Sequence, residues 1–389
     1  MRRAYRRAVA LSLASLLAAC GSSPQLPPQQ QAPVEVRGLP GAAVPSSPGA
    51  AEGQVRGPAR WLPAAWSELP GWDADRTREA WTALLRSCER LPIESAAAWA
   101  RACADAQRSP PADDAAARAW FLRWTQPWRV VAAEGGSSEG LATGYFEPQL
   151  DASRVPRGAR RVALHQPPAD LATRKPWFTR AQIDTLPVAQ AALRGREIAF
   201  VADPLDLLLL QVQGSGRVRI TEADGRLQTV RLAYAGHNDQ PYQSIGRWLI
   251  DQGELKPGEA SWPAIRDWAA RNPKRINELL NANPRVVFFR EEPLPDANLG
   301  PRGSQGVALV PERSIAVDPK AVPYGTPVWL DTTEPLTATP LRRLVLAQDS
   351  GSAITGAVRA DYFWGWGERA EQQAGRMKQA LRMWVLWPK

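Results

Sequence analysis

Short apolar segments follow one another at even spacing through the last part of the chain, and this pattern limits the possible folds more than any other feature. Between residues 306 and 389 the segments are separated by Gly, Pro and Asp. Evenly spaced short strands predict a small closed β-barrel, here within a mainly β protein that also contains helices. The expected strands cover residues 307–310, 314–317, 327–330, 344–347, 354–360 and 382–387.

Residues 75–125 are expected to form helices that pack against another part of the chain. Apolar side chains recur there at helical spacing, which predicts helices with a buried stripe. These side chains are Trp81, Leu84, Leu85, Cys88, Trp120, Phe121 and Trp124. The barrel is the only obvious partner for them, so we expect residues 61–140 and 286–389 to form one domain.

Residues 141–285 are expected to form a smaller β-rich domain inserted into the first, with a groove between the two. Asp224-Gly225 is a strong tight-turn signal, so the flanking residues 218–222 and 227–232 are expected to pair as a hairpin. The other elements expected in this region are strands at 141–146 and 197–201 and helices at 204–210 and 242–252.

The N-terminus has the layout of a secretory signal. Arginines in the first seven residues precede an apolar run over residues 8–19, which is too short for a membrane-spanning helix, since that needs about 20 apolar residues. The run ends in Leu-Ala-Ala-Cys-Gly at 17–21, a lipoprotein cleavage box. We expect removal of residues 1–19 and lipidation of Cys20, which would anchor the chain stably to a membrane. An ordinary secretory signal with an incidental cysteine is the alternative.

The residues after the cleavage box predict a tether on the outer membrane. Position 22 is Ser rather than Asp, so nothing opposes sorting of the lipoprotein to the periplasmic face of that membrane. Residues 20–60 are rich in Pro, Gln, Gly and Ser and hold almost no large apolar side chain, so we expect them to be disordered. Pro-rich composition would keep this tether extended.

The charge of the exported chain argues against nucleic acid as a partner. The formal net charge falls from +9 to +5 on removal of residues 1–19, because that segment holds four arginines and no acids. A basic surface binds phosphates wherever it meets them, but an exported chain meets the cell wall and the lipid surface instead. We therefore expect no nucleic-acid partner.

Cys88 and Cys103 are the two cysteines that remain after lipidation of Cys20. Disulfides persist in oxidising compartments, so we expect these two to pair and to join successive helices. The alternative is two free thiols packed as small hydrophobic groups.

The residue types favour carboxylates over metals as the source of chemistry. His165 and His237 are the only histidines, and no Cys-x-x-Cys or His-x-x-x-His spacing occurs, so the sequence predicts neither a metal site nor a cofactor. Residues 213–216 look like part of a phosphate loop, but the lysine and the following helix are missing.

Three aspartates of the barrel region, Asp318, Asp349 and Asp361, are expected at strand ends or in irregular loops. Asp361 precedes residues 362–366, of which all but Gly365 are aromatic, and these would desolvate its carboxyl and raise its pKa, as a general acid requires. Arg359 argues against a raised pKa, because it would share one strand face with Asp361. Turn-capping aspartates beside a purely structural aromatic cluster are the alternative interpretation.

Six short motifs follow one another in a fixed order. They are Gly-Tyr-Phe-Glu-Pro at 144–148, Leu-Gln-Val-Gln-Gly-Ser-Gly at 210–216, Tyr-Ala-Gly at 234–236, Tyr-Gln-Ser-Ile-Gly at 242–246, Gln-Asp-Ser-Gly at 348–351 and Asp-Tyr-Phe-Trp-Gly at 361–365. In this order they resemble the membrane-bound lytic murein transglycosylase A family. The C-terminal part also resembles the three-aspartate (3D) module, a double-psi β-barrel, whose aspartates fall on Asp318, Asp349 and Asp361.

The resemblance implies a double-psi barrel domain, an inserted β-rich domain, and a groove that binds peptidoglycan glycan strands. It implies cleavage of the β-1,4 bond between N-acetylmuramic acid and N-acetylglucosamine without water, with a 1,6-anhydro product. The family's catalytic acid falls on Asp361, and an accompanying aspartate falls on Asp349. Ser352 stands where the family has a second glycine, so the backbone geometry expected there does not carry over.

On this resemblance, Asp361 acts first as acid and then as base, and Asp349 supports it. Groove contacts to sugar or peptide are expected from Tyr145, Gln211, Gln213, Ser215, Gly216, Tyr234 and Gly351. A conventional hydrolase with Asp349 and Asp361 as a pair, and a wall-binding lipoprotein without catalysis, are the alternatives. We expect a monomer and leave membership of a cell-wall synthase complex open.

Overall fold

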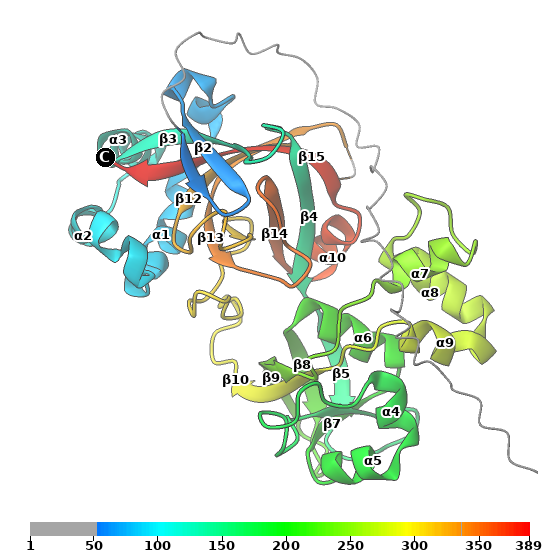
Figure 1. Ribbon diagram of the computed structural model, residues 1–389. Coiled ribbons are helices and arrows are strands. Elements are labelled where there is room, and N and C mark those ends of the chain that lie inside the picture. Colours follow the sequence, from blue (N-terminus) through cyan, green and yellow to red (C-terminus); the bar gives the residue numbers. More distant parts are fainter. Residues whose placement is uncertain (1–52, 336) are drawn as a thin grey trace, which may run out of the picture. The chain divides into compact units, whose positions relative to one another are not determined.

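A closed ring of strands confirms the small barrel expected from the C-terminal part of the chain (Figure 1). The computed structural model describes residues 53–335 and 337–389. One strand, β15, pairs with both β12 and β4 and thereby closes the ring. The ring contains β4 (Gly140–Glu147), β11 (Ser314–Ala316), β12 (Pro327–Thr333), β13 (Pro340–Asp349), β14 (Arg359–Trp366) and β15 (Lys378–Pro388).

Two of the expected barrel strands are wrong. Residues 307–310 contribute only an isolated bridge between Ala308 and Arg302, and residues 354–358 form a loop before β14. Val307 and Ile354 are nevertheless buried, so the apolar pattern marked burial correctly. Their segments satisfy backbone groups through turns, as when Ile354 N–H donates to the Gly351 carbonyl (2.9 Å), instead of through a strand ladder.

The expected tether extends too far toward the barrel. The strands β1 (Gln54–Arg56) and β2 (Ala59–Pro63) join the sheet through β3 (Thr125–Ala132), although all of β1 and part of β2 lie within residues 20–60. Trp61 is fully buried, and its indole N–H donates to the Ala321 carbonyl at 3.2 Å. This burial offsets the cost of ordering a segment whose composition is otherwise poor in apolar residues. The signal peptide, Cys20 and the rest of the tether lie outside the described residues.

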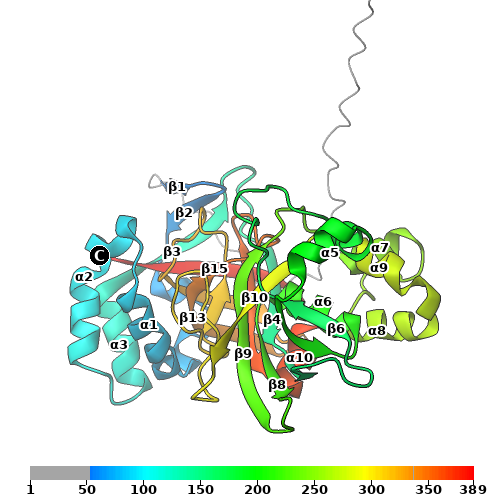
Figure 2. The ribbon, with the colours of Figure 1, turned by 90° about the horizontal axis from the view of Figure 1, so that it is seen from below.

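The helices expected before the barrel are present and contact its strands (Figure 1 and Figure 2). Helix α1 contacts β13 and helix α2 contacts β15, so their apolar stripes and the outer side chains of the barrel form one hydrophobic cluster. The helical segments are η1 (Trp66–Glu68), η2 (Trp72–Ala74), η3 (Thr77–Ala80), α1 (Trp81–Glu89), α2 (Ile93–Arg108) and α3 (Asp114–Trp124).

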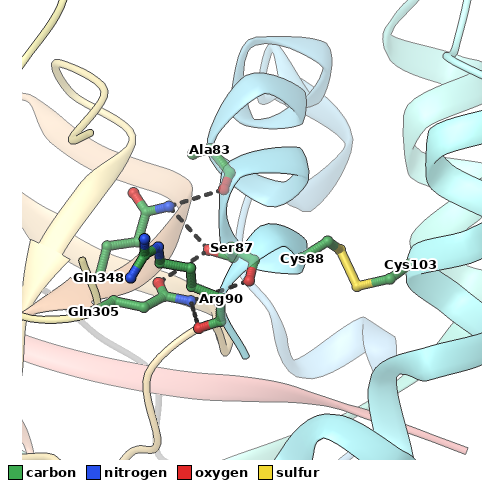
Figure 3. The surroundings of a disulfide bond; sticks show 7 residues. All are labelled: Ala83, Ser87, Cys88, Arg90, Cys103, Gln305 and Gln348. Carbon is green, nitrogen blue, oxygen red and sulfur yellow. Dashed lines mark hydrogen bonds between the residues drawn. A yellow bond between two sulfur atoms is a disulfide. The ribbon is translucent and has the colours of Figure 1, made fainter. Parts of the chain in front are cut away.

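Cys88 of α1 and Cys103 of α2 form a disulfide, which confirms the expected pairing (Figure 3). Replacing both by alanine is expected to lower the free energy of unfolding by about 3 kcal/mol, because the bond closes a loop of 15 residues. Urea unfolding of the wild type and the double variant, both without reductant, measures this difference. Equal midpoints would contradict the expectation.

Residues 149–293 form a second sheet with the order β10-β9-β8-β5-β7-β6. The expected hairpin is confirmed, since β8 and β9 pair antiparallel around the Asp224-Gly225 turn. The strands are β5 (Gln149–Ser153), β6 (Val162–His165), β7 (Glu197–Val201), β8 (Gly216–Thr221), β9 (Leu227–His237) and β10 (Val287–Pro293). The chain changes sheet at Pro148 and again after Pro293, a few residues beyond the expected boundaries at 141 and 285.

Helix α6 (Pro204–Gln213) begins as expected but runs one turn further. Asp203 caps its first turn by accepting from Leu205 N–H at 2.8 Å, and Gly214 ends it with a positive φ of 81°. Its buried face, with Leu210, packs against the second sheet. The remaining helices are α4 (Arg180–Thr185), α5 (Pro187–Leu193), α7 (Ile245–Asp251), α8 (Trp262–Arg271), η4 (Pro273–Arg275), α9 (Ile276–Asn281) and α10 (Glu368–Ala374). Across the described ranges, no helix combines the length and apolarity needed to cross a bilayer.

Candidate active site

Both candidate catalytic aspartates lie in one row across the barrel sheet. Ala316 of β11 is the register partner of Asp349 on one side and of Asp361 on the other. Thr143 of β4 pairs with Asp361 on the far side of β14. Since neighbouring strands lie about 4.8 Å apart, the two aspartate Cα atoms are separated by roughly 10 Å. The strand register, rather than a shared loop, therefore brings these carboxyl groups together.

Asp361 lies inside β14, where its carboxyl is partly exposed and has a hydroxyl donor. Thr143 Oγ1 donates to Asp361 Oδ1 at 2.5 Å. Arg359 donates to the backbone carbonyls of Ala360 (2.7 Å) and Leu141 (3.4 Å), and within the described chain no ion pair joins it to Asp361. Asp361 is thus the third residue of a strand and not in an irregular loop, and Arg359 acts on it without an ion pair.

Burial raises the pKa of the Asp361 carboxyl above its ordinary value of about 3.9. The Arg359 charge and the Thr143 hydrogen bond act in the opposite direction, while the negative charge of Asp349 raises the pKa further. Desolvation is the largest of these effects, so the carboxyl holds its proton at a higher pH than a solvated aspartate does. A group of this kind can donate a proton to a leaving oxygen.

The aromatic residues after Asp361 do not surround its carboxyl as expected. Side chains alternate along a strand, and Tyr362 and Trp364 belong to the buried core of the barrel. The ring of Phe363 lies beside that of Tyr145 of β4 in a tilted arrangement, with ring centroids 5.1 Å apart. The expected desolvation is present, although the side chains of Tyr362 and Trp364 belong to the barrel core.

Asp349 ends β13 and accepts hydrogen bonds on both carboxylate oxygens. Oδ1 accepts from the N–H and the hydroxyl of Ser304 (2.8 and 2.9 Å) and from Ser350 N–H (2.9 Å). Oδ2 accepts from the Tyr145 hydroxyl at 3.0 Å. Burial raises the pKa of Asp349, while these hydrogen bonds lower it. The donors fix the orientation of this carboxyl and connect it to Tyr145.

Gln348, the residue before Asp349, connects the site by hydrogen bonds to the first of the two disulfide-linked helices (Figure 3). Gln348 is fully buried, and its amide nitrogen donates to the Ala83 carbonyl (2.8 Å) and the Ser87 hydroxyl (2.9 Å) of α1. Gln305 donates to the Ser87 carbonyl at 3.1 Å. Helix α1 thus supports the end of β13 that presents Asp349.

The carboxylate of Asp318, the third aspartate of the 3D pattern, is occupied by backbone N–H groups and has a structural role. One carboxylate oxygen accepts from Lys320 N–H (3.0 Å) and the other from Gly356 N–H (2.9 Å). Gly356 has a φ of 110°, a conformation that favours glycine. Asp318 therefore holds the loop between Asp349 and Asp361, in which Gly351 and Ser352 are exposed.

The other expected contact residues are distributed over several environments. Tyr145 joins the aspartate row, and the Gln213 side chain accepts from Phe146 N–H at 3.0 Å, next to that row. Tyr234 is 46% exposed on β9. Ser215 and Gly216 follow the end of α6, and a side chain at Gly216 would collide with Leu210.

Gln211 is buried in a network of its own. Its amide oxygen accepts from Arg180 Nη2 at 2.7 Å, and its amide nitrogen donates to the Val287 carbonyl at 3.2 Å. These contacts join α6 to β10. Nothing in them brings the Gln211 side chain to the aspartates.

A buried ion network lies where the chain passes between the sheets. Glu147, the last residue of β4, is fully buried and accepts from Arg217 Nε (2.8 Å) and Arg231 Nε (2.6 Å). Both arginines also donate to the Leu299 carbonyl, and the Arg217 guanidinium stacks on Trp366 at 3.6 Å. In the sequence, Glu147 stands out only as part of the motif at 144–148, and no local signal marks either arginine.

Two cavities of the described chain are lined by residues other than Asp361. The first, of about 370 Å³, is lined by Gly144 and Phe146 of β4 together with residues of α6, α8 and α10. Successive side chains of β4 point to opposite faces, so this cavity lies behind the strand face that carries Thr143 and Tyr145. Within the described chain no group of three acidic, histidine or cysteine side chains is arranged to hold a metal ion.

Two family models match the chain, and together they define its class. The MltA specific insert domain matches residues 141–290, and the 3D domain matches residues 313–387. The first range covers most of the second sheet, and the second covers the barrel strands from Ser314 of β11 onward. The chain is thus a 3D-domain barrel protein with an MltA-type insert.

Relatives with known names agree with this class. The membrane-bound lytic murein transglycosylase A of Vibrio cholerae is 33% identical over 284 residues, which cover 69% of this chain and 73% of the relative. The structure of the lytic transglycosylase LtgG of Burkholderia pseudomallei matches with 49% identity and a TM-score of 0.59, over 88% of this chain and 99% of that one. Escherichia coli MltA with bound chitohexaose matches with 26% identity and a TM-score of 0.65, over 87% and 96%. The chain belongs to the membrane-bound lytic murein transglycosylase A family.

Proposed function

We propose that this chain is a peptidoglycan lytic transglycosylase in which Asp361 is the single acid and base. Family membership supports the reaction, and the observation that carries the residue assignment is the partly buried carboxyl of Asp361 with its raised pKa, free of an ion pair with Arg359 within the described chain. The substrate is the β-1,4 bond from N-acetylmuramic acid to N-acetylglucosamine.

In the first step, protonated Asp361 donates its proton to the glycosidic oxygen as the bond to the anomeric carbon breaks. In the second, the Asp361 carboxylate takes the proton of the 6-hydroxyl of the same muramic acid while that oxygen bonds to the anomeric carbon. Asp361 ends protonated, and no water is consumed. The internal nucleophile gains from proximity, which is worth several kcal/mol.

The bonding of Asp349 favours this route over a conventional pair of carboxylates. Its oxygens already accept from Ser304, Ser350 and Tyr145, so it is less suited to activate a water molecule. We assign it to charge stabilisation and to orientation of Tyr145. Hydrolytic glycosidases instead need a second carboxylate as base or nucleophile.

The glycan strand is proposed to contact Tyr145, Gln213, Ser215, Gly216, Tyr234 and Gly351. Chitohexaose, a sugar oligomer, occupies the E. coli relative, which supports a glycan ligand here. Gln211 is hydrogen-bonded to Arg180, so it would affect binding of the glycan strand only by fixing the position of α6.

Incubation of the purified protein with sacculi tests the reaction. We expect 1,6-anhydro-muropeptides in the mass spectrum of the digest. Products with a free reducing end would indicate a hydrolase, and sedimentation with sacculi without any product would indicate a binding protein.

Replacing Thr143 by valine tests the protonation of Asp361. The Thr143 hydrogen bond favours the ionised carboxyl and so lowers its pKa, and its removal is expected to raise that pKa. Because catalysis begins with protonated Asp361, activity is lost as pH rises through this pKa, and the basic limb of kcat/KM should move to higher pH in Thr143→Val. Thr143→Ser keeps the hydroxyl and should leave the limb in place. If the basic limb of kcat/KM in Thr143→Val stays at the wild-type pH or moves to lower pH, this role of Thr143 is refuted.

We further propose that lipid on Cys20 anchors the chain at the periplasmic face of the outer membrane. The composition of the N-terminus and the names of the membrane-bound relatives support this position. An extended tether would allow the folded part to reach glycan strands beyond the membrane surface. A monomer suffices for the chemistry above, and a complex with cell-wall synthases is compatible with it.

A further inference from the structure

A group of aromatic and cationic side chains around the end of β9 takes no part in the proton transfers. This β9 cluster consists of Tyr234, His237, Tyr242, Lys175 and Arg285. Tyr234 and Tyr242 are 46% and 36% exposed, and the rings of Tyr234 and His237 lie 6.3 Å apart. Lys175 is exposed and Arg285 half-buried. Exposed tyrosines beside an arginine are a composition typical of binding sites.

Two buried asparagines hold the backbone of the β9 cluster in place. Asn238 is fully buried, and its amide donates to the carbonyls of Phe178 (2.8 Å) and Pro284 (2.9 Å). Asn283 is also buried and accepts from Arg285 N–H at 3.2 Å. The loop after β9 and the segment that carries Arg285 are therefore fixed to each other before any ligand arrives, which reduces the entropy lost on binding.

The guanidinium of Arg285 is oriented but has no acidic partner. Its Nε donates to the Gln240 carbonyl at 2.8 Å, and no ion pair is formed by Arg285 in the described part of the chain. An acid, Asp239, lies beside the cluster, with its carboxylate 3.8 Å from Nδ1 of His237. The terminal nitrogens of Arg285 therefore remain available to an anion.

The charge of the β9 cluster comes from Arg285 and Lys175. Burial, together with these two cations, lowers the pKa of His237, and only Asp239 opposes them. His237 is thus neutral at neutral pH and offers hydrogen bonds rather than charge. The cluster and its neighbour Asp239 together carry two positive charges, on Arg285 and Lys175, and one negative charge. The net positive charge favours binding of an anion.

We infer that the β9 cluster binds a carboxylate of the short peptides that branch from the glycan strand, with Arg285 as its anchor. The inference rests on the proposed function, since it assigns a second part of the same substrate. The planar fork of an arginine binds a carboxylate through two parallel hydrogen bonds. Anionic lipid surfaces are instead recognised by groups of about four to eight Lys and Arg, which the β9 cluster does not supply.

Two soluble substrates test the inference with the full-length protein in detergent. One is glycan strands that carry their peptides, and the other is the same strands after an amidase has removed them. The wild type is expected to have a higher kcat/KM on the peptide-bearing strands. In Arg285→Gln the ratio of the two kcat/KM values should fall about tenfold, because a charge-assisted hydrogen-bonded pair is lost.

Two further variants make the result decisive. Arg226→Gln removes an exposed arginine at the β8–β9 turn of the same sheet and should leave the ratio unchanged. Arg285→Lys keeps the charge without the fork, so its ratio should lie between those of the wild type and Arg285→Gln, and it serves if Arg285→Gln fails to fold. Equal kcat/KM values of the wild type on both substrates, or equal losses on both in Arg285→Gln, would overturn the inference. Absence of anhydro products from either substrate with the wild type would instead refute the proposed function.

Discussion

Asp361→Asn is expected to lower the rate of anhydro-muropeptide release from sacculi by about 10²–10⁴-fold, the range that general acid and base catalysis contributes. An amide cannot give a proton to the glycosidic oxygen or take one from the 6-hydroxyl. The asparagine oxygen can still accept the hydrogen bond from Thr143, so the barrel should remain folded. Mass spectrometry of timed digests measures the rate, and sedimentation with sacculi should show that the variant still binds.

The exposed Asp251 of α7, which pairs with Arg247, provides the matched control for this prediction. Asp251→Asn makes the same chemical change far from the aspartate row in sequence and should keep the wild-type rate. If Asp361→Asn also kept most of the rate, the proton transfers would have to belong to another group. Loss of sedimentation together with activity would point to a binding role for the side chain.

The sequence predicted the barrel and the hairpin because both leave local signals. Alternation of short apolar runs with Gly, Pro and Asp marks strands, and Asp-Gly marks a tight turn. The closure itself could not be read in this way. Strand β15 pairs with β3, β4 and β12, which lie far from it in sequence, and such pairings depend on the whole sheet.

The apolar segments at 307–310 and 354–358 show where a local pattern fails. Burial requires apolar side chains, but it does not require a ladder of backbone hydrogen bonds. In the second segment the carboxylate of Asp318 and a turn at Gly351 satisfy the backbone instead. A run of apolar residues therefore predicted the environment of these residues correctly and their backbone conformation wrongly.

The aspartates of the site and Tyr145 were predicted, but the hydroxyl groups of Thr143 and Ser304 that bind the aspartates were not. Thr143 lies two residues before Tyr145 on β4, so strand alternation places both on one face. That spacing was a usable signal once Tyr145 was a candidate. Ser304 offered none, because it comes from an irregular segment that reaches Asp349 only through the tertiary fold.

Removal of the Glu147 carboxylate is expected to lower the free energy of unfolding by about 3–5 kcal/mol, the cost of breaking a buried ion pair. Glu147 is fully buried, and the side chains of Arg217 and Arg231 are only 5% and 4% exposed. In Glu147→Ala, two guanidinium groups would stay out of water without a counter-charge. Their hydrogen bonds to the carbonyl of Leu299 do not replace it, since a carbonyl carries only a partial charge.

Asp151→Ala is the matched control for Glu147→Ala, because it breaks an exposed Arg–carboxylate pair of the second sheet, to which Arg217 and Arg231 also belong. The side chains of Arg219 and Asp151 are 57% and 50% exposed, and exposed pairs contribute about 0–1 kcal/mol. Urea unfolding of both variants compares the two environments directly. A Glu147→Ala loss no larger than that of Asp151→Ala would mean that water or a rearranged backbone compensates the two arginines. A large loss would show that the buried carboxylate of Glu147 stabilises the connection between the two sheets. In that connection β4 ends and the segment at Leu299 returns.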